Sequence, residues 1–346
     1  MRLLRHPFLL SAPSLLVNPR HHPIVYSAHY SPPEWPARHA FPMMKFKDTH
    51  THLATSIVNE LQSPLILSAS HTYTPQHSFL PALRSPPHDA DYVNRFLTCT
   101  RTKEERERIG FKDSLTDIVV NRTLAEISGT CLAATLALDY KLATTIAGGT
   151  HHAFPNFGSG YTILNDLVIA SHYLLSTVSS GVSRVLVIDC DVHQGDGTAY
   201  FSQQPLFKNK MFTLSVHAKE NFPFEKRRSS YDVELESGAG DEEYMEAIEP
   251  AIEQALKECE PDLVIYDAGV DVLAEDRLGK LQLTVEGMRR RDRFVIERCV
   301  EGGFPIACVV GGGYNRDGEV LAKRHAVVHE EAARVWRERQ LWRARA

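Results

Sequence analysis

The chain has 346 residues, 43% of them hydrophobic and 23% charged, which is enough to bury the core of one large α/β domain or two smaller ones. A formal net charge of −5 excludes a strongly basic protein that holds nucleic acid by its overall field, so no direct nucleic-acid binding is expected. Six scattered cysteines without a C-x-x-C pair argue against a disulfide framework, and no apolar run approaches the roughly 20 residues of a membrane span.

Residues 1–22 form an N-terminal extension with a composition of its own. They include Arg2, Arg5 and Arg20 but no acidic residue, which is typical of an organellar transit peptide. Pro7 and Pro13 interrupt any helix there, so a disordered extension is the alternative. The compartment therefore stays open between nucleus or cytoplasm and an organelle, either mitochondrion or plastid.

The first predicted element is a strand at PIVYS, residues 23–27. From there to about residue 118 the chain is rich in Pro, His and Ser with few clean hydrophobic periods, so we expect mostly loops. Apolar residues then recur at helical spacing and predict a buried helix over residues 120–140.

From residue 184 onward, strand-like and helix-like stretches alternate. The predicted strands are VLVID, MFTLSVH, DLVIYDAG and PIACVVGGG. The predicted helices between and after them lie near residues 242–258, 284–301 and 317–338. This alternation predicts a parallel sheet with helices on both faces, and without a repeat or linker we expect residues 23–340 to form one domain. In such sheets functional groups collect beyond the carboxyl ends of the strands.

The run VLVIDCDVHQGDG, residues 185–197, ends an apolar strand in Asp189, Asp191, His193 and Asp196. Asp191 and His193 are two positions apart, so in an extended segment their side chains point the same way and can bind one cation. An isolated D-x-H pair is more often a turn acid beside a packed histidine. Burying three acids without partners is costly, however, which favours a metal and histidine partners here.

Adjacent histidines follow a glycine pair in GGTHHA, residues 148–153. Two neighbouring rings do not readily bind one metal from a regular element, so His151 and His152 suit proton transfer better; exposed loop histidines are the alternative. An aspartate on the far nitrogen of each ring would fix its tautomer and raise its basicity, and Asp189 and Asp196 are acids of the right kind.

Two later strand ends also carry polar residues. In YDAGVDVLAEDRLG, residues 266–279, Asp271 either adds a carboxylate to the same crevice or serves with its neighbours as a turn residue. In VVGGGYN, residues 309–315, three glycines either let the chain approach a ligand beside Tyr314 or form a tight turn. Two carboxylates and one histidine leave a coordination position open, which with a histidine base and a phenol suits metal-assisted amide hydrolysis.

Together these motifs resemble the zinc-dependent histone deacetylases and the related bacterial deacetylases and acetylpolyamine amidohydrolases. Five motifs occur in the family's order between about Pro23 and residue 335: GGTHHA, GSGYTILND, DCDVHQGDGTA, GVDVLAEDRLG and GGGY. The stretches RHAFPMMKF and DRLG are most similar to class IV histone deacetylases and their bacterial relatives. The resemblance implies a single arginase/deacetylase-type α/β domain with a mostly parallel sheet, and acyl-lysine proteins or peptides, histones among them, as partners.

The resemblance also implies a role for each site residue. One catalytic Zn²⁺ would be bound by Asp191, His193 and Asp271. Two histidines would stand beside the attacking water, each with an acid behind it: His151 with Asp189, and His152 with Asp196. Tyr314 would donate a hydrogen bond to the carbonyl oxygen of the acyl-lysine.

A narrow tunnel for the acyl chain is implied as well, with these candidates for its wall: Gly160, Tyr161, Phe222 and Gly312. The family binds a monovalent cation, usually K⁺, near Asp189. Its candidate ligands here are the backbone oxygens of Asp191, His193 and Val216 and the side chain of Ser215.

The chain departs from the family pattern in several places. Tyr161 and Thr162 replace the Phe-Cys pair of many relatives, so we expect a more polar tunnel wall. Glu275 stands where glycine is usual, and its charge is expected to alter the rim. The acidic rim residue that grips the substrate is not assigned, because the region around Asp113 aligns poorly. Gly195 occupies the position of a metal-binding acid in the arginases, which favours a single metal.

The sequence thus predicts zinc-dependent hydrolysis of N-acyl-lysine, acetyl or longer. Two alternatives stay open. One is an amidohydrolase for acetylpolyamines or other small acylated amines. The other is a non-catalytic corepressor that binds acyl-lysine, although such a protein would not need an intact set of ligands and bases. Acyl-chain length, physiological substrates and oligomeric state are not predicted.

Overall fold

The computed structural model describes residues 22–36, 38–60, 72–73, 87–111 and 117–342. The expected extension lies outside these ranges except for His22, and so does the region around Asp113. In the part of the chain that is described, no helix is both long and apolar enough to cross a membrane.

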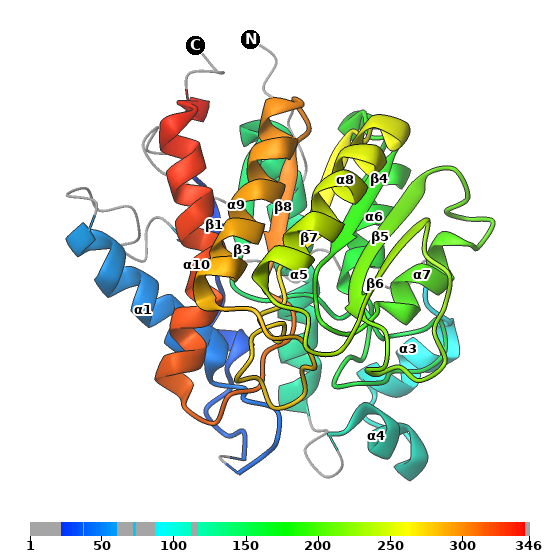
Figure 1. Ribbon diagram of the computed structural model, residues 1–346. Coiled ribbons are helices and arrows are strands. Elements are labelled where there is room, and N and C mark those ends of the chain that lie inside the picture. The colour runs from blue at the N-terminus through cyan, green and yellow to red at the C-terminus, as the bar shows by residue number, and fades with distance from the viewer. Residues whose placement is uncertain (1–21, 37, 61–71, 74–86, 112–116, 343–346) are drawn as a thin grey trace.

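One eight-stranded sheet forms the centre of the fold (Figure 1), and its strands follow the order β2-β1-β3-β8-β7-β4-β5-β6. Their bounds are β1 (Ile24–Val25), β2 (Thr72–Tyr73), β3 (Leu142–Thr145), β4 (Val185–Asp189), β5 (Met211–Ala218), β6 (Tyr231–Leu235), β7 (Leu263–Asp267) and β8 (Ile306–Val309). Each pairing between the described strands is parallel. The α/β class and the parallel sheet that the sequence predicts are therefore confirmed.

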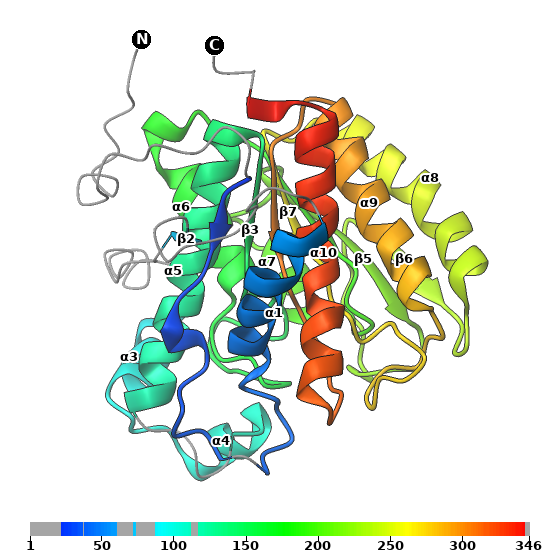
Figure 2. The same ribbon diagram turned by 90° about the vertical axis from the view of Figure 1, so that its left-hand side faces the viewer.

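Helices cover both faces of the sheet, as Figures 1 and 2 show. One face carries α5 (Asp117–Tyr140) and α6 (Asp166–Ser176), and the other carries α8 (Asp241–Cys259), α9 (Val285–Glu301) and α10 (Gly318–Glu338). Helix α1 (Lys45–Glu60) lies beside α10. The shorter helices are η1 (Ala28–Tyr30), α3 (Ala90–Leu97), α4 (Lys103–Ile109), η3 (Val178–Ser180) and α7 (Asp196–Ser202).

Alternate residues of the central strands pack into two different cores, which explains why these runs are apolar without interruption. In β4, Val185 and Val187 belong to the core that includes residues of α5 and α6. Leu186 and Ile188 belong to the core formed with α8, α9 and α10. Since neither face of the strand meets water, the polar groups of this region gather at the strand end.

The stretch before residue 118 is not mainly loop where it is described, which corrects the sequence prediction. Helices α1, α3 and α4 lie there, and α4 begins with a Thr102–Glu105 capping box. Such a box is a recognisable helix start, but the following seven residues are too few and too polar to show a hydrophobic period. Strands β3 and β6 were not predicted either, because one is only four residues long and the other is half exposed at the sheet edge.

Arg291 of α9 links the ends of β4 and β7. Its guanidinium is fully buried, and Nη1 donates to the carbonyl of Cys190 at 3.0 Å and to that of Gly269 at 2.8 Å. Nε donates to Asp292, 2.9 Å away, and Asp292 also accepts the hydroxyl of Tyr266 at 2.6 Å. One buried cation thus ties together the two loops that carry most of the acidic residues discussed below.

We expect Arg291→Met to lower the free energy of unfolding by about 3–5 kcal/mol, because it leaves Asp292 buried without its cationic partner and two buried carbonyls without their donor. Urea denaturation followed by circular dichroism measures the loss. Arg290→Met is the matched control, because Arg290 is half exposed and pairs with an exposed glutamate, Glu242. A change below about 1 kcal/mol is expected for it. Equal losses in the two variants would contradict the role given to Arg291.

Candidate active site

Four neighbouring strands end at the site. In the sheet order β3, β8, β7 and β4 lie side by side, and the segments that follow them are the four motifs GGTHHA, GGGYN, DAGVD and DCDVHQGDG. Asp189 and Asp267 are the last residues of β4 and β7 and face each other in register. Parallel strands therefore bring together, at one sheet edge, residues that lie more than a hundred positions apart in the sequence.

Asp191, His193 and Asp271 form a buried cluster whose ligand atoms all lie within 4.8 Å of one another. Nδ1 of His193 is 2.9 Å from Oδ1 of Asp191 and 3.2 Å from Oδ2 of Asp271. The outer carboxylate oxygens are held by backbone amides, since Gly312 N donates to Asp191 at 2.8 Å and Val192 N donates to Asp271 at 2.9 Å. Asp271 Oδ2 receives no hydrogen bond from a described residue.

This donor set fits a divalent cation of the zinc type. Two carboxylates and one imidazole are three ligands, a number that leaves a coordination position open in catalytic zinc sites. A cation between them would supply the partner that Asp271 Oδ2 lacks and would offset the repulsion between two buried carboxylates. The three residues singled out in the sequence thus lie where one ion can contact them all.

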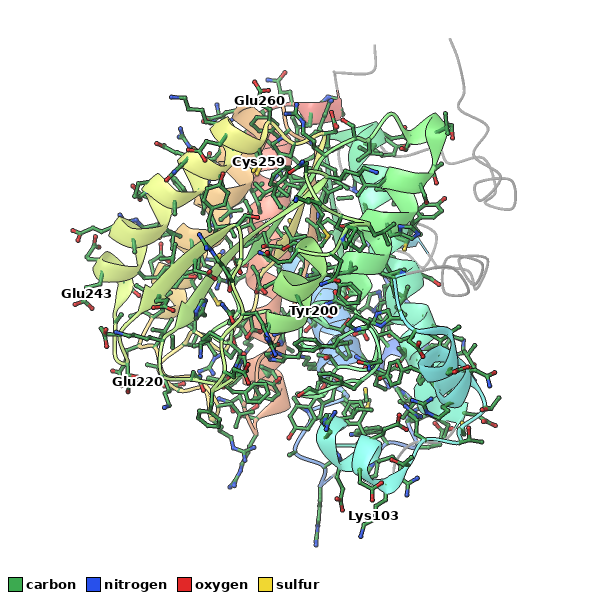
Figure 3. The ribbon with its side chains drawn as sticks, turned by 90° about the vertical axis from the view of Figure 1, so that its right-hand side faces the viewer. Lys103, Tyr200, Glu220, Glu243, Cys259 and Glu260 are labelled. Carbon is green, nitrogen blue, oxygen red and sulfur yellow. The ribbon has the colours of Figure 1, made fainter. Side chains whose placement is uncertain are left out.

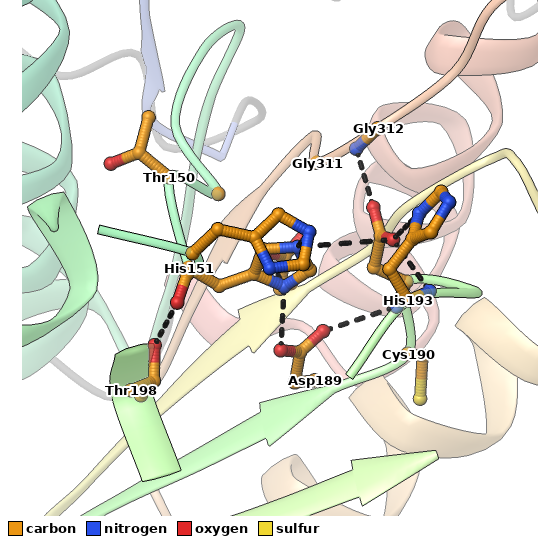
Figure 4. Close-up of polar contacts among 12 residues, drawn as sticks. Thr150, His151, Asp189, Cys190, His193, Thr198, Gly311 and Gly312 are labelled. Atoms are coloured by element: carbon orange, nitrogen blue, oxygen red, sulfur yellow. Dashed lines mark hydrogen bonds and ion pairs between the residues drawn. The ribbon is translucent and has the colours of Figure 1, made fainter. Parts of the chain in front are cut away.

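The paired histidines lie next to this cluster, and each has an aspartate behind it. Nδ1 of His151 is 2.8 Å from Asp189 (Figure 4). Nδ1 of His152 is 2.7 Å from Asp196. The two Nε2 atoms are 3.1 Å apart, and Nε2 of His151 is 3.9 Å from Asp191. The aspartates therefore occupy Nδ1 of each ring. Nε2 of His151 is left on the side of the metal-ligand cluster, and Nε2 of His152 faces that of His151.

The two histidines have opposite protonation tendencies. Burial disfavours a charged His151, but Asp189 and Asp191 outweigh it and raise the pKa of His151 well above its usual value. Burial, together with the positive charge on His151, lowers the pKa of His152 to about 4. These surroundings therefore favour a proton on His151 over one on His152.

A cavity beside the histidines is walled by aromatic and glycine residues. Gly160, Tyr161 and Gly312 line it, as the sequence led us to expect, together with Tyr314. The Tyr161 ring lies 5.9 Å from that of Tyr314. Phe222 is not part of this lining, but its ring lies 4.9 Å from that of His152. Tyr161, which was predicted to make the tunnel wall more polar, therefore lies in the cavity wall beside a second tyrosine, Tyr314.

The position of Gly160 requires glycine for two reasons, the lack of a side chain and the backbone conformation. Its φ is +53°, a left-handed conformation that favours glycine, and a Cβ there would lie 2.6 Å from the His152 ring. Tyr161 follows with φ +64°. The turn thus presents Tyr161 to the cavity while its preceding residue leaves room for the base.

The segment GSGYTILND also holds the histidine loop, a role that sequence reasoning missed. Asp166 accepts the backbone amide of Thr150 at 2.7 Å and that of Gly149 at 3.2 Å. The side chain of Asn165 donates to the carbonyl of His151 at 3.3 Å. The motif was visible in the sequence, but only the structure reveals what its two polar residues contact.

Lys45 and Asp276 are two more residues that the sequence did not single out. Nζ of Lys45 donates to the carbonyl of Gly311 at 3.0 Å, and burial lowers its pKa to about 8. Lys45 also lines the cavity. Asp276 accepts the backbone amide of Tyr314 at 2.7 Å. Lys45 lies in RHAFPMMKF and Asp276 lies in DRLG, two stretches that resemble the family. The resemblance therefore included both residues but assigned no role to either.

Asp267 adds a further buried carboxylate, and neither of its oxygens is hydrogen-bonded to a described residue. Its Oδ2 is 4.0 Å from Nδ1 of His151. Burial and the charge of Asp189 raise the pKa of Asp267 well above its usual value. Its side chain is thus fully buried in the site rather than part of a surface turn.

Two other sequence expectations concern charges and cations near the site. Glu275 does not stand free at the rim, because it forms an ion pair with Arg324 of α10. Ser215, a candidate K⁺ ligand, faces Asp189 in the register of β4 and β5, and its hydroxyl is 3.0 Å from Nδ1 of His217. Ser215 is therefore the neighbour of Asp189 in the sheet, and its role as a K⁺ ligand stays a prediction.

Comparison with known proteins gives this geometry a family. A model of the histone deacetylase domain matches residues 48–330. The chain belongs to the histone deacetylase family. It is 42% identical to a Picosynechococcus protein described as uncharacterized, over 91% of this chain and 99% of that one. It is 33% identical to histone deacetylase 2 of Arabidopsis thaliana, over 55% of this chain and 48% of the other.

Two further comparisons add a second prokaryotic relative and a solved structure. A probable deacetylase of Archaeoglobus fulgidus is 30% identical over 67% of this chain and 66% of its own. The crystal structure of the HDA15 HD domain superposes with a TM-score of 0.68 at 19% identity, covering 91% of this chain and 88% of that one. The last likeness supports the fold, and the family assignment supports a deacetylase that acts by hydrolysis.

Gly312 offers a direct test of the metal-ligand cluster. A methyl group there would collide with the carboxylates of both Asp191 and Asp271. We expect Gly312→Ala to weaken Zn²⁺ binding by at least about tenfold, a change of about 1.4 kcal/mol. Competition with a zinc-binding dye measures the affinity. Gly240→Ala, where a Cβ meets nothing within 4 Å, is the matched control. Unchanged affinity in Gly312→Ala would place the metal elsewhere.

Proposed function

We propose that this deacetylase hydrolyses N-acyl-lysine, acetyl or longer, in histones or other proteins with the help of one zinc ion. The observation that carries the proposal is the position of two buried His–Asp pairs beside the Asp191–His193–Asp271 cluster. Nε2 of His151 is 3.9 Å from Asp191, and the His152 ring lies 6.0 Å from that of His193. A neutral base, a charged histidine and an open three-ligand set are the groups that amide hydrolysis requires.

When bound, a zinc ion lowers the pKa of a coordinated water and polarises the substrate carbonyl. His152 takes a proton from the attacking water at Nε2, because Asp196 occupies its Nδ1. Asp196 also stabilises the positive charge that His152 then carries. His151 is already protonated, so it supports the negative charge that develops beside it.

Tyr314 donates its phenol hydrogen to the oxyanion of the substrate. It lines the same cavity as both histidines, and its ring lies 6.5 Å from that of His193. Burial raises the pKa of Tyr314 well above the usual tyrosine value, so it keeps its proton and remains a donor. A protonated histidine then passes a proton to the lysine nitrogen as the carbon–nitrogen bond breaks.

A structural K⁺ is part of the proposal. Its ligands would be the backbone oxygens of Asp191, His193 and Val216 and the hydroxyl of Ser215. The position of Ser215 beside Asp189 supports it, because a monovalent cation there would offset a buried carboxylate. The similarity of RHAFPMMKF and DRLG to class IV enzymes supports placing the protein in that class.

Replacing the base or the phenol should abolish most activity without unfolding the protein. We expect His152→Ala to lower kcat on an acetyl-lysine peptide by about 10²–10⁴-fold and Tyr314→Phe by about 10²–10³-fold. Tyr200→Phe is the control for the tyrosine variant, because Tyr200 lies on α7 away from the cavity lining (Figure 3). Near-normal rates in either test variant would contradict the mechanism.

A panel of acylated substrates tests the substrate class. Zinc-loaded protein is incubated with lysine peptides carrying acetyl to myristoyl groups and with free acetylpolyamines, and released carboxylate is measured. We expect turnover of acyl-lysine peptides that stops after treatment with a chelator and returns with Zn²⁺. Preference for acetylpolyamines would favour the small-amine alternative, and binding of peptide without any cleavage would favour a non-catalytic reader.

A further inference from the structure

Two large apolar side chains stand exposed on loops that contact the active site. Phe224 is 88% exposed and Leu278 is 41% exposed. Exposed apolar side chains are common singly, but two on adjoining loops beside a catalytic cavity call for a partner. We call Phe224 and Leu278 the apolar rim.

Phe224 is connected to the catalytic base through one ring. Its ring centroid lies 6.5 Å from that of Phe222, which in turn lies 4.9 Å from that of His152. Phe222 also lies 6.4 Å from His193. A continuous aromatic path therefore leads from the metal-ligand cluster outward to an exposed phenylalanine.

Leu278 is connected to the catalytic tyrosine in a similar way. Asp276 accepts the backbone amides of Leu278 at 2.9 Å and of Tyr314 at 2.7 Å, each with a different oxygen. The loop that carries Leu278 is thus held against the residue proposed as the oxyanion donor.

The two loops are fastened to each other and are rigid at this point. The side chain of Asn221 donates to the carbonyl of Leu278 at 2.9 Å, and Lys280 donates to the carbonyl of Glu220 at 2.7 Å. Figure 3 labels Glu220, two residues after β5. Lys226 donates to the carbonyls of both Asn221 and Pro223 at 2.6 Å. Side chains on such fixed loops are preorganised to bind, because little ordering is left to complete.

The charged side chains beside Phe224 do not mark this surface as a site for a charged ligand. Lys226 is engaged by two carbonyls, and Arg227 pairs with Glu225 at 3.4 Å. These charges beside Phe224 are therefore already partnered within the loop. What the rim offers to a ligand is apolar surface.

We propose that the apolar rim binds an apolar side chain of the peptide next to the acyl-lysine. This inference rests on the proposed function, since it assumes that the acyl-lysine enters the cavity between the rim loops. It commits the enzyme to acylated peptides with a flanking apolar residue rather than to free small amines, which carry no such side chain.

The test measures binding separately from turnover. Zinc-loaded protein is titrated against fluorescent pentapeptides whose central residue is the uncleavable ketone analogue of acetyl-lysine, flanked by leucine or by serine, and anisotropy gives Kd. We expect the leucine peptide to bind about tenfold more tightly, because leucine buries apolar surface against Phe224. Phe224→Ala should reduce this ratio to less than about threefold.

Val178→Ala is the matched control. Val178 is 99% exposed but lies between α6 and β4, at the opposite ends of the strands. The tenfold ratio should persist in this variant. Equal Kd values for the two peptides would overturn the rim proposal, even if acetyl-lysine peptides are cleaved. Absent cleavage with a persisting tenfold ratio would overturn the proposed reaction while supporting the rim.

A second copy of the chain is the competing occupant of this patch. Sedimentation velocity of the full chain and of Phe224→Ala distinguishes it. We expect the same mass for both proteins. A loss of dimer in the variant would overturn the proposal, because the patch would then be an interface between copies.

Discussion

Four buried carboxylates at the ends of two adjacent strands are the constraint on which the site depends. Ligand atoms of Asp189 and Asp267 lie within 4.8 Å of each other and of His151, and those of Asp191 and Asp271 lie as close to each other and to His193. The two groups adjoin, because Nε2 of His151 is 3.9 Å from Asp191. Such a concentration of like charge is unfavourable in a protein interior unless cations or donors offset it. The neighbouring features, from the charged His151 to the backbone amides of Val192 and Gly312, all reduce that repulsion.

The site residues that the sequence predicts best are those whose types are unusual in a protein core. Aspartates and histidines that follow a buried strand stand out, and parallel topology explains why they converge. The supporting residues were harder to find. Asn165 and Asp166 act through the backbone of the histidine loop, one on a carbonyl and the other on an amide. Such a bond does not depend on the type of the residue that supplies the backbone group, so it leaves no signal in the sequence.

The long elements of the fold are likewise easier to predict from the sequence than the short ones. Long apolar runs such as VLVID predict central strands, and the helices of 17 or more residues that cover them are long enough to show a hydrophobic period. Short elements were not predicted, because they have too few residues to show a hydrophobic pattern. The four residues of β3 include two threonines, and only its neighbours β1 and β8 make it a strand. Arg291 likewise reads as one member of a basic surface run, yet it is the most deeply buried cation of α9.

The double hydrogen bond of Asp276 has a mechanical consequence. Because this carboxylate holds both its own loop and the amide of Tyr314, the segment that begins with Asp271, the proposed metal ligand, is tied to the backbone of Tyr314, the proposed oxyanion donor. The backbone of Tyr314 cannot move away from this loop without breaking its bond to Asp276. Under the proposed function, a bulky acyl group that displaced Tyr314 would therefore also strain the loop that carries Asp271, so the same few hydrogen bonds would limit both the acyl groups that fit and the position of the proposed metal ligand.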